Sequence, residues 1–345
     1  MKFYNMRISN IDRITDESVV LSIEIPSEIK SLFKYIAGQY ISLELDIESK
    51  TIRRSYSICS APNEELLQVG IKELKNGIFS SYANKKLRPG DKIRVGEPEG
   101  RFILDPENRK YPIMAIAAGS GITPIMSILK FFLTSDSNTS FTLIYGNKSP
   151  QKTMFYQELL LLEKLNPKKF KIHWIFSQAN IDGSAFGRID TAFINFAMNN
   201  SHSNLARFYI CGPESLIKLS QELLLKRGVD ENNIFFELFS ASPTKSAFLK
   251  SVDKGVLKIT CDQVTHTLDL IKGKTLLEIA LEAKLEVPYS CQGGVCSSCI
   301  AKITRGKATM ENNQILTDDE VSEGLVLSCQ AIAQSQEVYL DFDEA

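Results

Sequence analysis

Residues 288–299 read PYSCQGGVCSSC, and this stretch decides how the C-terminal part of the chain is organised. The spacing is Cys291-x4-Cys296-x2-Cys299, and Cys329 follows after 29 intervening residues. The pattern C-x4-C-x2-C with a distant fourth cysteine is that of plant-type [2Fe–2S] sites. Three thiolates on one tight loop surround most of a two-iron cluster, and the fourth returns from a distant strand to complete it. The sequence therefore predicts a [2Fe–2S] cluster held by these four cysteines.

The glycines of the loop and the other cysteines fit this interpretation. Gly293 and Gly294 let the backbone pass close to the cluster, with amides free to bind sulfur. A zinc site is an alternative, but zinc ribbons prefer two C-x2-C pairs. Unligated thiols are another. The chain has seven cysteines, too few and an odd number for a disulfide scaffold, and Cys59, Cys211 and Cys261 are isolated.

Length and composition narrow the class of protein. A chain of 345 residues holds roughly two to three domains. Apolar residues make up 43% and charged residues 23%, as in ordinary globular proteins. A net charge of −1 argues against nucleic-acid binding, which usually needs a basic excess. The absence of an apolar run of 18 residues, or of a signal-peptide pattern, predicts no membrane span and a soluble cytoplasmic protein.

Three segments follow one another along the chain. Residues 1–107 contain many short strands between turns, which predicts an antiparallel β-barrel. Residues 108–239 alternate strands with helices, which predicts an α/β domain with a doubly wound parallel sheet. Residues 240–252 are rich in Ser and Lys and are interpreted as a linker. Residues 253–345 form a small mixed module.

The C-terminal segments carry a resemblance to a known family. Residues 288–299, Gly306-Lys-Ala-Thr-Met310 and Val326-Leu-Ser-Cys-Gln330 resemble a plant-type ferredoxin domain, which implies a β-grasp fold. The chain is most similar to the reductases of phenylacetyl-CoA epoxidase and related oxygenases, which place such a domain after a flavin reductase of the ferredoxin–NADP reductase superfamily. The resemblance extends over nearly the whole chain.

The predicted barrel contains three segments that resemble the flavin site of this superfamily. Arg54-Ser55-Tyr56-Ser57 matches its RxYS motif, Gly77-Ile-Phe-Ser80 a pyrophosphate-binding helix start, and Gly38-Gln-Tyr40 its GQY segment. Arg54 offers a cationic fork to a pyrophosphate, Tyr56 an aromatic face, and Ser57 a hydroxyl near the reactive edge. A helix start with free amides also favours phosphate. The resemblance implies FAD rather than FMN, with residues from Val69 to Lys72 beside the flavin.

The α/β segment contains matching nicotinamide motifs. Gly119-Ser-Gly121-Ile-Thr123-Pro124 follows a buried strand and opens a helix, as a dinucleotide-binding turn does, but Pro124 replaces the third glycine of the Rossmann pattern. GxGxTP instead resembles the NAD(P) lobe of the superfamily, as does Cys211-Gly212-Pro213 at the end of a later strand.

The same resemblance assigns roles near the two rings. It implies that Ser57, Thr123, Cys211 and Glu237 border the site of hydride transfer, and that Phe239 packs on the flavin. The sequence leaves the choice between NADH and NADPH open. Gln178 stands where phosphate-specific relatives often have Arg, which favours NADH, but Lys148 offers another cation.

These motifs together predict an electron-transfer reductase. NAD(P)H gives two electrons as hydride, a two-iron cluster passes one at a time, and a flavin between them exchanges electrons in pairs or singly. A terminal oxygenase, of the phenylacetyl-CoA epoxidase type, is the expected acceptor. The alternatives are a desaturase or hybrid-cluster protein as acceptor, or a ferredoxin-like carrier with inactive flavin lobes.

The distribution of charge suggests how such a partner is recognised. Residues 253–345 hold 8 basic and 15 acidic residues, a net of −7, whereas residues 1–252 carry +6. Asp318, Asp319, Glu320 and Glu323 form an acidic stretch shortly before Cys329. It is either a solvated face or a surface that docks on basic partners, the chain's own flavin lobes and the oxygenase.

Overall fold

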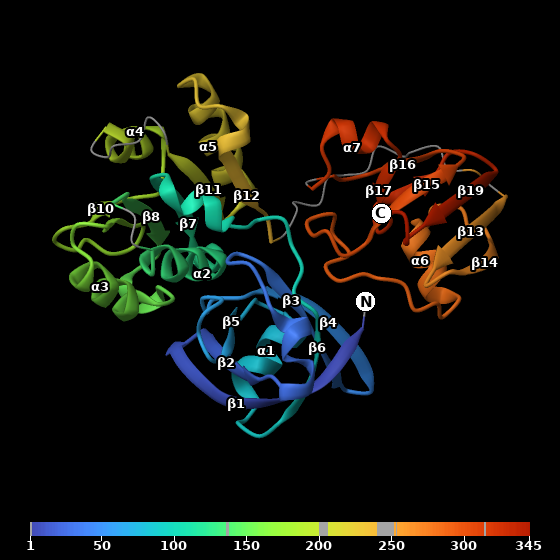
Figure 1. The fold of residues 1–345 in the computed structure, drawn as a ribbon, viewed down its shortest axis with the longest axis horizontal. Helices are drawn as coiled ribbons and strands as arrows, with labels where there is room; N and C mark the ends of the chain where they lie inside the picture. Colours follow the sequence, from blue (N-terminus) through green and yellow to red (C-terminus); the bar gives the residue numbers. More distant parts are fainter. Residues whose placement is uncertain (1, 136–137, 200–205, 240–251, 253, 314) are drawn as a thin grey trace. The chain divides into compact units, whose positions relative to one another are not determined.

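The computed structural model describes residues 2–345 except 136–137, 200–205, 240–251, 253 and 314. The described chain divides into two units, Lys2–Leu238 and Phe239–Ala345 (Figure 1). The predicted linker 240–252 lies, apart from residue 252, outside the described residues.

The first part of the larger unit is a six-stranded antiparallel sheet with the order β4-β3-β6-β1-β2-β5. Its elements are β1 (Phe3–Thr15), β2 (Ser18–Glu24), β3 (Tyr40–Ile47), β4 (Lys50–Ser57), β5 (Leu67–Lys72), helix α1 (Ile78–Lys85) and β6 (Lys92–Gly96). Glu48 and Ser49 have φ angles of 50° and 62°, so β3 and β4 are joined by a tight two-residue turn. The bridge between Ile58 and Val69 brings the end of β4 against β5 and closes the sheet into the predicted barrel.

The second part is a parallel sheet with the order β10-β9-β8-β7-β11-β12. Its elements are β7 (Ile113–Ala118), α2 (Ile122–Leu133), β8 (Phe141–Asn147), α3 (Tyr156–Leu165), β9 (Phe170–Phe176), β10 (Ala185–Phe186), α4 (Thr191–Asn199), β11 (Arg207–Cys211), α5 (Glu214–Lys226) and β12 (Ile234–Glu237). Helices α2 and α3 cover one face, and α4 and α5 the other (Figure 1). Because helices cover both faces, β7 and β8 are buried along most of their length.

The barrel and the parallel sheet share apolar core. Phe102 and Leu104, which precede the predicted boundary at residue 107, are buried in the core of the α/β part. The Tyr209 hydroxyl donates to the Ile103 carbonyl at 3.1 Å. At the same interface between the barrel and the parallel sheet, Lys130 of α2 forms two ion pairs. One is with Glu158 at 2.8 Å and the other with Glu64 of the barrel at 3.7 Å. These contacts fix the two parts against each other within one unit.

The smaller unit is a five-stranded mixed sheet with the order β14-β13-β19-β15-β17 and a two-stranded sheet of β16 and β18. Its elements are β13 (Val256–Cys261), β14 (Val264–Asp269), α6 (Leu276–Glu282), β15 (Ile300–Arg305), β16 (Ala308–Met310), α7 (Asp318–Ser322), β17 (Leu325–Leu327), β18 (Ala331–Ala333) and β19 (Glu337–Asp341). Strands β13 and β19 pair in parallel at the centre of the sheet, and a Thr275–Glu278 capping box begins α6. The predicted β-barrel, parallel α/β sheet and ferredoxin-type module are therefore confirmed.

No helix in the described part of the chain is long and apolar enough to cross a membrane.

Candidate functional site

Two adjacent arginines of β4 have different surroundings. Arg53 is mostly buried and pairs with the Glu44 carboxylate at 2.6 Å. Arg54 is exposed and donates to the Arg53 carbonyl at 2.6 Å, and no carboxylate of the described residues forms an ion pair with it. A guanidinium without a carboxylate partner is available to an anion, as the prediction for Arg54 requires.

The two residues after Ser55 point into the interior of the larger unit. The half-buried ring of Tyr56 lies 5.3 Å, centroid to centroid, from Phe79 of α1, and its burial raises the phenol pKa, so the hydroxyl stays neutral. Ser57 is buried and donates to the Glu237 carboxylate at 3.1 Å. This bond joins the end of β4 in the barrel to the end of β12 in the parallel sheet.

At the start of α1, the Ser80 side chain forms hydrogen bonds within the turn that precedes the helix. The Ser80 hydroxyl accepts the Leu74 N–H at 3.1 Å and lies 3.4 Å from the Gly77 carbonyl. A Cβ at Gly77 would come within 2.4 Å of that hydroxyl oxygen, so a side chain there would displace the Ser80 hydroxyl from its bond to Leu74. The amides of the first helical turn lack intrahelical acceptors and are therefore available to an anion such as a phosphate.

Strand β5 presents two faces. Val69 is fully buried in the barrel core, so only its backbone can meet a cofactor. Gly70 faces the α/β part, where an added Cβ would lie 2.8 Å from the Thr123 methyl carbon. Lys72, which alternates onto the face of Gly70, has its pKa lowered by burial, an effect that the Glu17 carboxylate opposes.

The glycine-rich turn after β7 is pressed against the end of β11. A Cβ at Gly121 would lie 2.1 Å from the Cys211 carbonyl oxygen, so no other residue fits there. Thr123 is buried, and its hydroxyl donates to the Ser120 carbonyl at 3.0 Å. Pro124 stands in the first turn of α2, where a missing N–H costs no helical hydrogen bond, which explains the departure from the Rossmann pattern.

Three of the predicted hydride-transfer residues form one buried group. Cys211 and Glu237 are paired neighbours on β11 and β12, and Ser57 donates to Glu237. Burial is the larger cause that raises the pKa of the Cys211 thiol, and the nearby Glu237 carboxylate is the smaller one. The thiol therefore stays protonated. Thr123 reaches the same end of the sheet, because its turn contacts Cys211 through Gly121. Gly212 and Pro213 follow directly and lead into α5.

Other predicted residues lie outside this group. Lys148 and Gln178 are exposed where β8 and β9 end, and the Gln178 N–H donates to the Lys148 carbonyl at 2.9 Å. The carboxyl ends of parallel strands are where ligands of such sheets bind. Phe239 is 41% exposed and is the first residue of the smaller unit.

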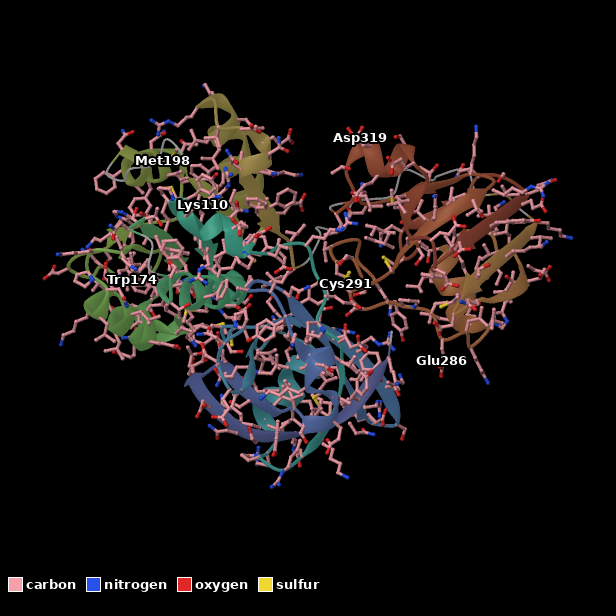
Figure 2. All side chains as sticks on the ribbon, in the orientation of Figure 1. Lys110, Trp174, Met198, Glu286, Cys291 and Asp319 are labelled. Atoms are coloured by element: carbon pink, nitrogen blue, oxygen red, sulfur yellow. The ribbon has the colours of Figure 1, made fainter. Side chains whose placement is uncertain are left out.

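The four cysteines of the C-terminal module form two pairs. The Cys296 thiol donates to Cys291 and lowers the Cys291 pKa to about 7, while the Cys299 thiol donates to Cys329 and lowers its pKa. Cys296, Cys299 and Cys329 are buried, and Cys291 is half-buried at the tip of its loop (Figure 2). The cysteine that is distant in sequence thus joins the last cysteine of the loop.

This pairing distinguishes a two-iron cluster from a single ion. Four thiolates around one zinc, with bonds of about 2.3 Å, would place all sulfur atoms about 3.8 Å apart. Among the described residues, no three of the four thiols lie within 4.8 Å of one another. Two separate pairs match the two ends of a two-iron rhomb, so the donor set fits the [2Fe–2S] cluster better than zinc.

Three further residues hold the cysteine loop and were missed by sequence reasoning. The buried Ser328 hydroxyl donates to the Cys299 carbonyl at 2.9 Å, and the side-chain amides of Asn312 and Gln330 bind loop carbonyls. Ser328 and Gln330 flank Cys329 in the sequence, which is the one signal that pointed to them.

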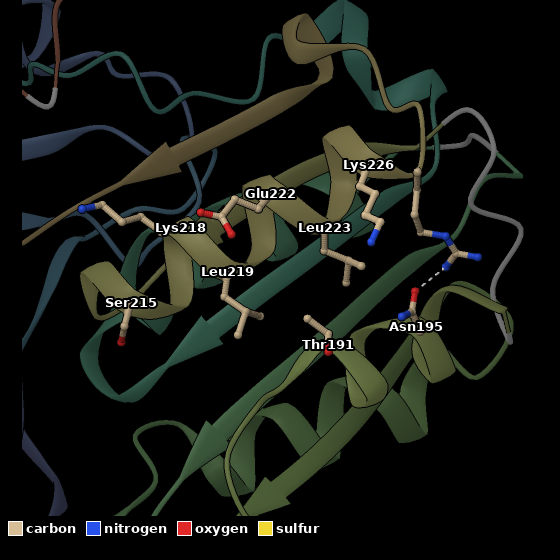
Figure 3. Close-up of a pocket in the computed structure, with 9 residues that line it drawn as sticks. Thr191, Asn195, Ser215, Lys218, Leu219, Glu222, Leu223 and Lys226 are labelled. Carbon is tan, nitrogen blue, oxygen red and sulfur yellow. Dashed lines mark hydrogen bonds between the residues drawn. The ribbon is translucent and has the colours of Figure 1, made fainter.

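A separate open groove lies between α4 and α5 (Figure 3). Lys218, Glu222 and Lys226 line it, and across its end Arg227 donates to Asn195 at 3.0 Å. None of the predicted site residues lines this groove.

Comparisons with known families match each part of the chain. Residues 5–103 match the oxidoreductase FAD-binding domain, residues 115–222 the oxidoreductase NAD-binding domain, and residues 259–334 the 2Fe-2S iron–sulfur cluster binding domain. These matches define the class as an NAD(P)H-dependent oxidoreductase that uses FAD and a [2Fe–2S] cluster.

Full-length relatives narrow the class to a family. One component of the 1,2-phenylacetyl-CoA epoxidase of Escherichia coli is 32% identical, over 99% of this chain and 98% of that protein. The ferredoxin reductase component of 3-ketosteroid-9-alpha-monooxygenase from Mycobacterium tuberculosis is 28% identical, over 98% and 96%. Phthalate dioxygenase reductase shares the fold, with a TM-score of 0.62 and 22% identity over 99% of this chain and 98% of that one. The chain belongs to the family of oxygenase reductase components that combine an FAD-binding, an NAD-binding and a 2Fe-2S domain.

Arg54→Ala is expected to weaken FAD binding about 10- to 100-fold, because a charge-assisted contact to a phosphate would be lost. Lys50→Ala, an exposed substitution at the other end of β4, is the control and is expected to bind FAD normally. FAD affinity is measured by titrating flavin into the flavin-depleted chain. Equal affinities in the two variants would remove Arg54 from the site.

Proposed function

We propose that this chain passes electrons from NAD(P)H through FAD and a [2Fe–2S] cluster to a terminal oxygenase of the phenylacetyl-CoA epoxidase type. The observation that carries the proposal is a four-cysteine site, in which Ser328 beside Cys329 binds the Cys299 carbonyl of the cysteine loop, in a chain that also contains the Ser57–Glu237–Cys211 group. The 32% identical relative is itself a component of such an epoxidase. The proposed modules are residues 1–107, 108–239 and 253–345, and a reducing compartment such as the cytoplasm suits the free thiols.

Bound FAD and the cluster would together supply the conversion of a hydride into single electrons. The chain's own residues place these groups. Arg54 and the first-turn amides of α1, beginning at Gly77 and Ser80, would bind the FAD pyrophosphate, and Ser55, Tyr56, Val69 and Lys72 would flank the flavin.

The nicotinamide would lie at the carboxyl end of the parallel sheet. Gly121 keeps the turn close to β11, and Gly119 adopts a positive φ of 57° within it. Thr123 and Cys211 would then border the ring, and Gly212 and Pro213 would line the same site. The protonated Cys211 thiol and the buried Ser57 hydroxyl would line this site as neutral groups. Glu237 orients Ser57 through their hydrogen bond, and Phe239 is proposed to cover the flavin.

Cys296→Ala tests the proposed ligands. We expect the wild-type chain, prepared without oxygen, to contain about two irons and two sulfides. The variant should lose them and keep NADH-driven bleaching of the flavin, because the flavin motifs lie in the other unit. Cys261→Ala removes a free thiol from the same module and should keep its iron. Zinc in place of iron in the wild-type protein, or full iron in Cys296→Ala, would contradict the assignment.

Gln178→Arg tests the choice of coenzyme. The side chain would stand beside Lys148 at the end of β9 and add a cation for the 2′-phosphate of NADPH. We expect the ratio of kcat/KM for NADPH to that for NADH to rise at least about tenfold, as one charge-assisted contact provides. Asn180→Arg, two residues further along the loop, is the control. An unchanged ratio in Gln178→Arg would place the 2′-hydroxyl elsewhere.

Helix α7 is the proposed docking surface for the oxygenase. Asp318 and Asp319 are exposed, and no ion pair involves them within the described part of the chain. Figure 2 labels Asp319 on this helix. Glu320 differs, because its carboxylate accepts the Thr317 N–H at 2.9 Å in a capping box. Reversal of Glu320 would unwind the helix start, so the charge at Asp318 and Asp319 is the part to test.

The double variant Asp318→Lys with Asp319→Lys is expected to slow reduction of the oxygenase severalfold and to leave flavin reduction by NADH unchanged. Asp269→Lys with Glu286→Lys changes the net charge equally on other exposed positions of the module and is the control. Because exposed charges are screened within about 8 Å at physiological ionic strength, wild-type turnover with the oxygenase should also fall as salt rises. If both double variants reduced the oxygenase at the same rate, α7 would be a solvated surface with no role in docking.

A further inference from the structure

Two side-chain amides connect the cysteine loop to the segment around Cys329. The Gln330 amide donates to the Gln292 carbonyl at 3.2 Å, and the Asn312 amide donates to the Gly293 carbonyl at 3.0 Å. These two carbonyls belong to consecutive peptide units of the loop. Both donors come from the part of the module that lies C-terminal to β16.

The orientation of the two peptide units decides where their N–H groups point. In a trans peptide the carbonyl and the following N–H point in opposite directions. The Gln292 carbonyl faces Gln330, so the Gly293 N–H points to the other side, where it donates to Cys291 Sγ at 3.4 Å. The Gly293 carbonyl faces Asn312, so the Gly294 N–H points away from Asn312. The two side-chain amides thus fix the loop from which the Gly293 N–H reaches Cys291 Sγ.

The packing leaves little freedom for the loop. Gly294 has a φ of +73°, and an added Cβ would lie 2.9 Å from both the Asn312 carbonyl oxygen and Gln330 Cγ. Gln330 also donates directly to Cys329 Sγ at 3.5 Å. The same amide therefore orients one peptide and binds one sulfur itself.

We propose that Asn312 and Gln330 act as an amide clamp that raises the reduction potential of the cluster by aiming backbone N–H groups at its sulfur ligands. The inference rests on the proposed cluster at Cys291, Cys296, Cys299 and Cys329. Hydrogen bonds to the sulfurs of an iron–sulfur cluster help to set its potential, since they stabilise the more negative, reduced form. Asn312 and Gln330 are positioning residues, with Gln330 adding one direct contact.

The test compares Gln330→Leu and Asn312→Leu with Gln334→Leu in the full chain. Gln334 lies four residues beyond Gln330, and its side-chain amide donates to the Ile332 carbonyl at 3.4 Å, away from the cysteine sulfurs. Iron content is measured first, and the midpoint potential then follows from an EPR-monitored redox titration. Resonance Raman spectra in H₂O and D₂O report the exchangeable N–H groups on sulfur.

We expect Gln330→Leu to lower the equilibrium constant for one-electron reduction about tenfold, which is a fall of about 59 mV. Asn312→Leu should shift it in the same direction by less, and Gln334→Leu should match the wild type. The D₂O shift of the iron–sulfur bands should shrink in the first two variants only. If Gln330→Leu does not retain iron, the midpoint potential of Asn312→Leu tests the proposal instead. The Asn312 amide donates to a loop carbonyl rather than to a sulfur, so its loss should disturb iron binding less.

Wild-type midpoints and D₂O shifts in an iron-replete Asn312→Leu and Gln330→Leu would overturn the clamp and leave the proposed function intact. A wild-type chain that bound zinc instead of iron would overturn the proposed function, and the clamp with it.

Discussion

The close approach of four cysteine sulfurs in two pairs is the constraint on which the C-terminal module depends. Bringing four thiolates out of water would be prohibitive without compensating positive charge. Hydrogen bonds within each pair lower the pKa of Cys291 and Cys329 and raise the pKa of their partners Cys296 and Cys299. Because cysteine binds metal as the thiolate, the affinity of the site must rise as pH rises.

The fold of the module supplies the geometry for this pairing. The Ser328 N–H and hydroxyl both bind the Cys299 carbonyl, so the ligand that comes from the turn after β17 is tied to the last ligand of the loop. The Leu277 N–H of α6 donates to the Ser328 carbonyl at 3.0 Å and anchors the same turn to the core. Helix α6, whose buried side chains belong to the same core cluster as Cys299 and Cys329, thus helps to position the cluster site.

A comparable constraint governs the larger unit. Gly121 touches the Cys211 carbonyl and Gly70 touches Thr123, so glycine at both positions lets three backbone segments meet. Ser57 and Glu237 join the barrel to the parallel sheet at the same place. The unit thereby joins residues that lie 180 positions apart in the sequence by one hydrogen bond, at the place proposed for the meeting of flavin and nicotinamide.

The sequence predicted the three parts of the fold because their signals are local. Alternating short strands, alternating strands and helices, and the cysteine spacing each depend on neighbouring residues. Which side chains face a cofactor was harder to predict, because it depends on register. Val69 points into the barrel core, the Ser80 hydroxyl closes its own turn, and Glu320 caps a helix. The amides of Asn312 and Gln330 escaped notice because their partners are carbonyls, which no motif records.

The central claim is that electrons from NADH reach the four-cysteine site through the flavin of the same chain. An anaerobic titration of the complete protein with NADH, followed by visible absorption and EPR spectroscopy, tests it most directly. The account predicts that the flavin absorbance bleaches and that the EPR signal of a reduced [2Fe–2S] cluster grows with it. Bleaching of the flavin without any such signal, in protein that contains its full iron, would contradict the account.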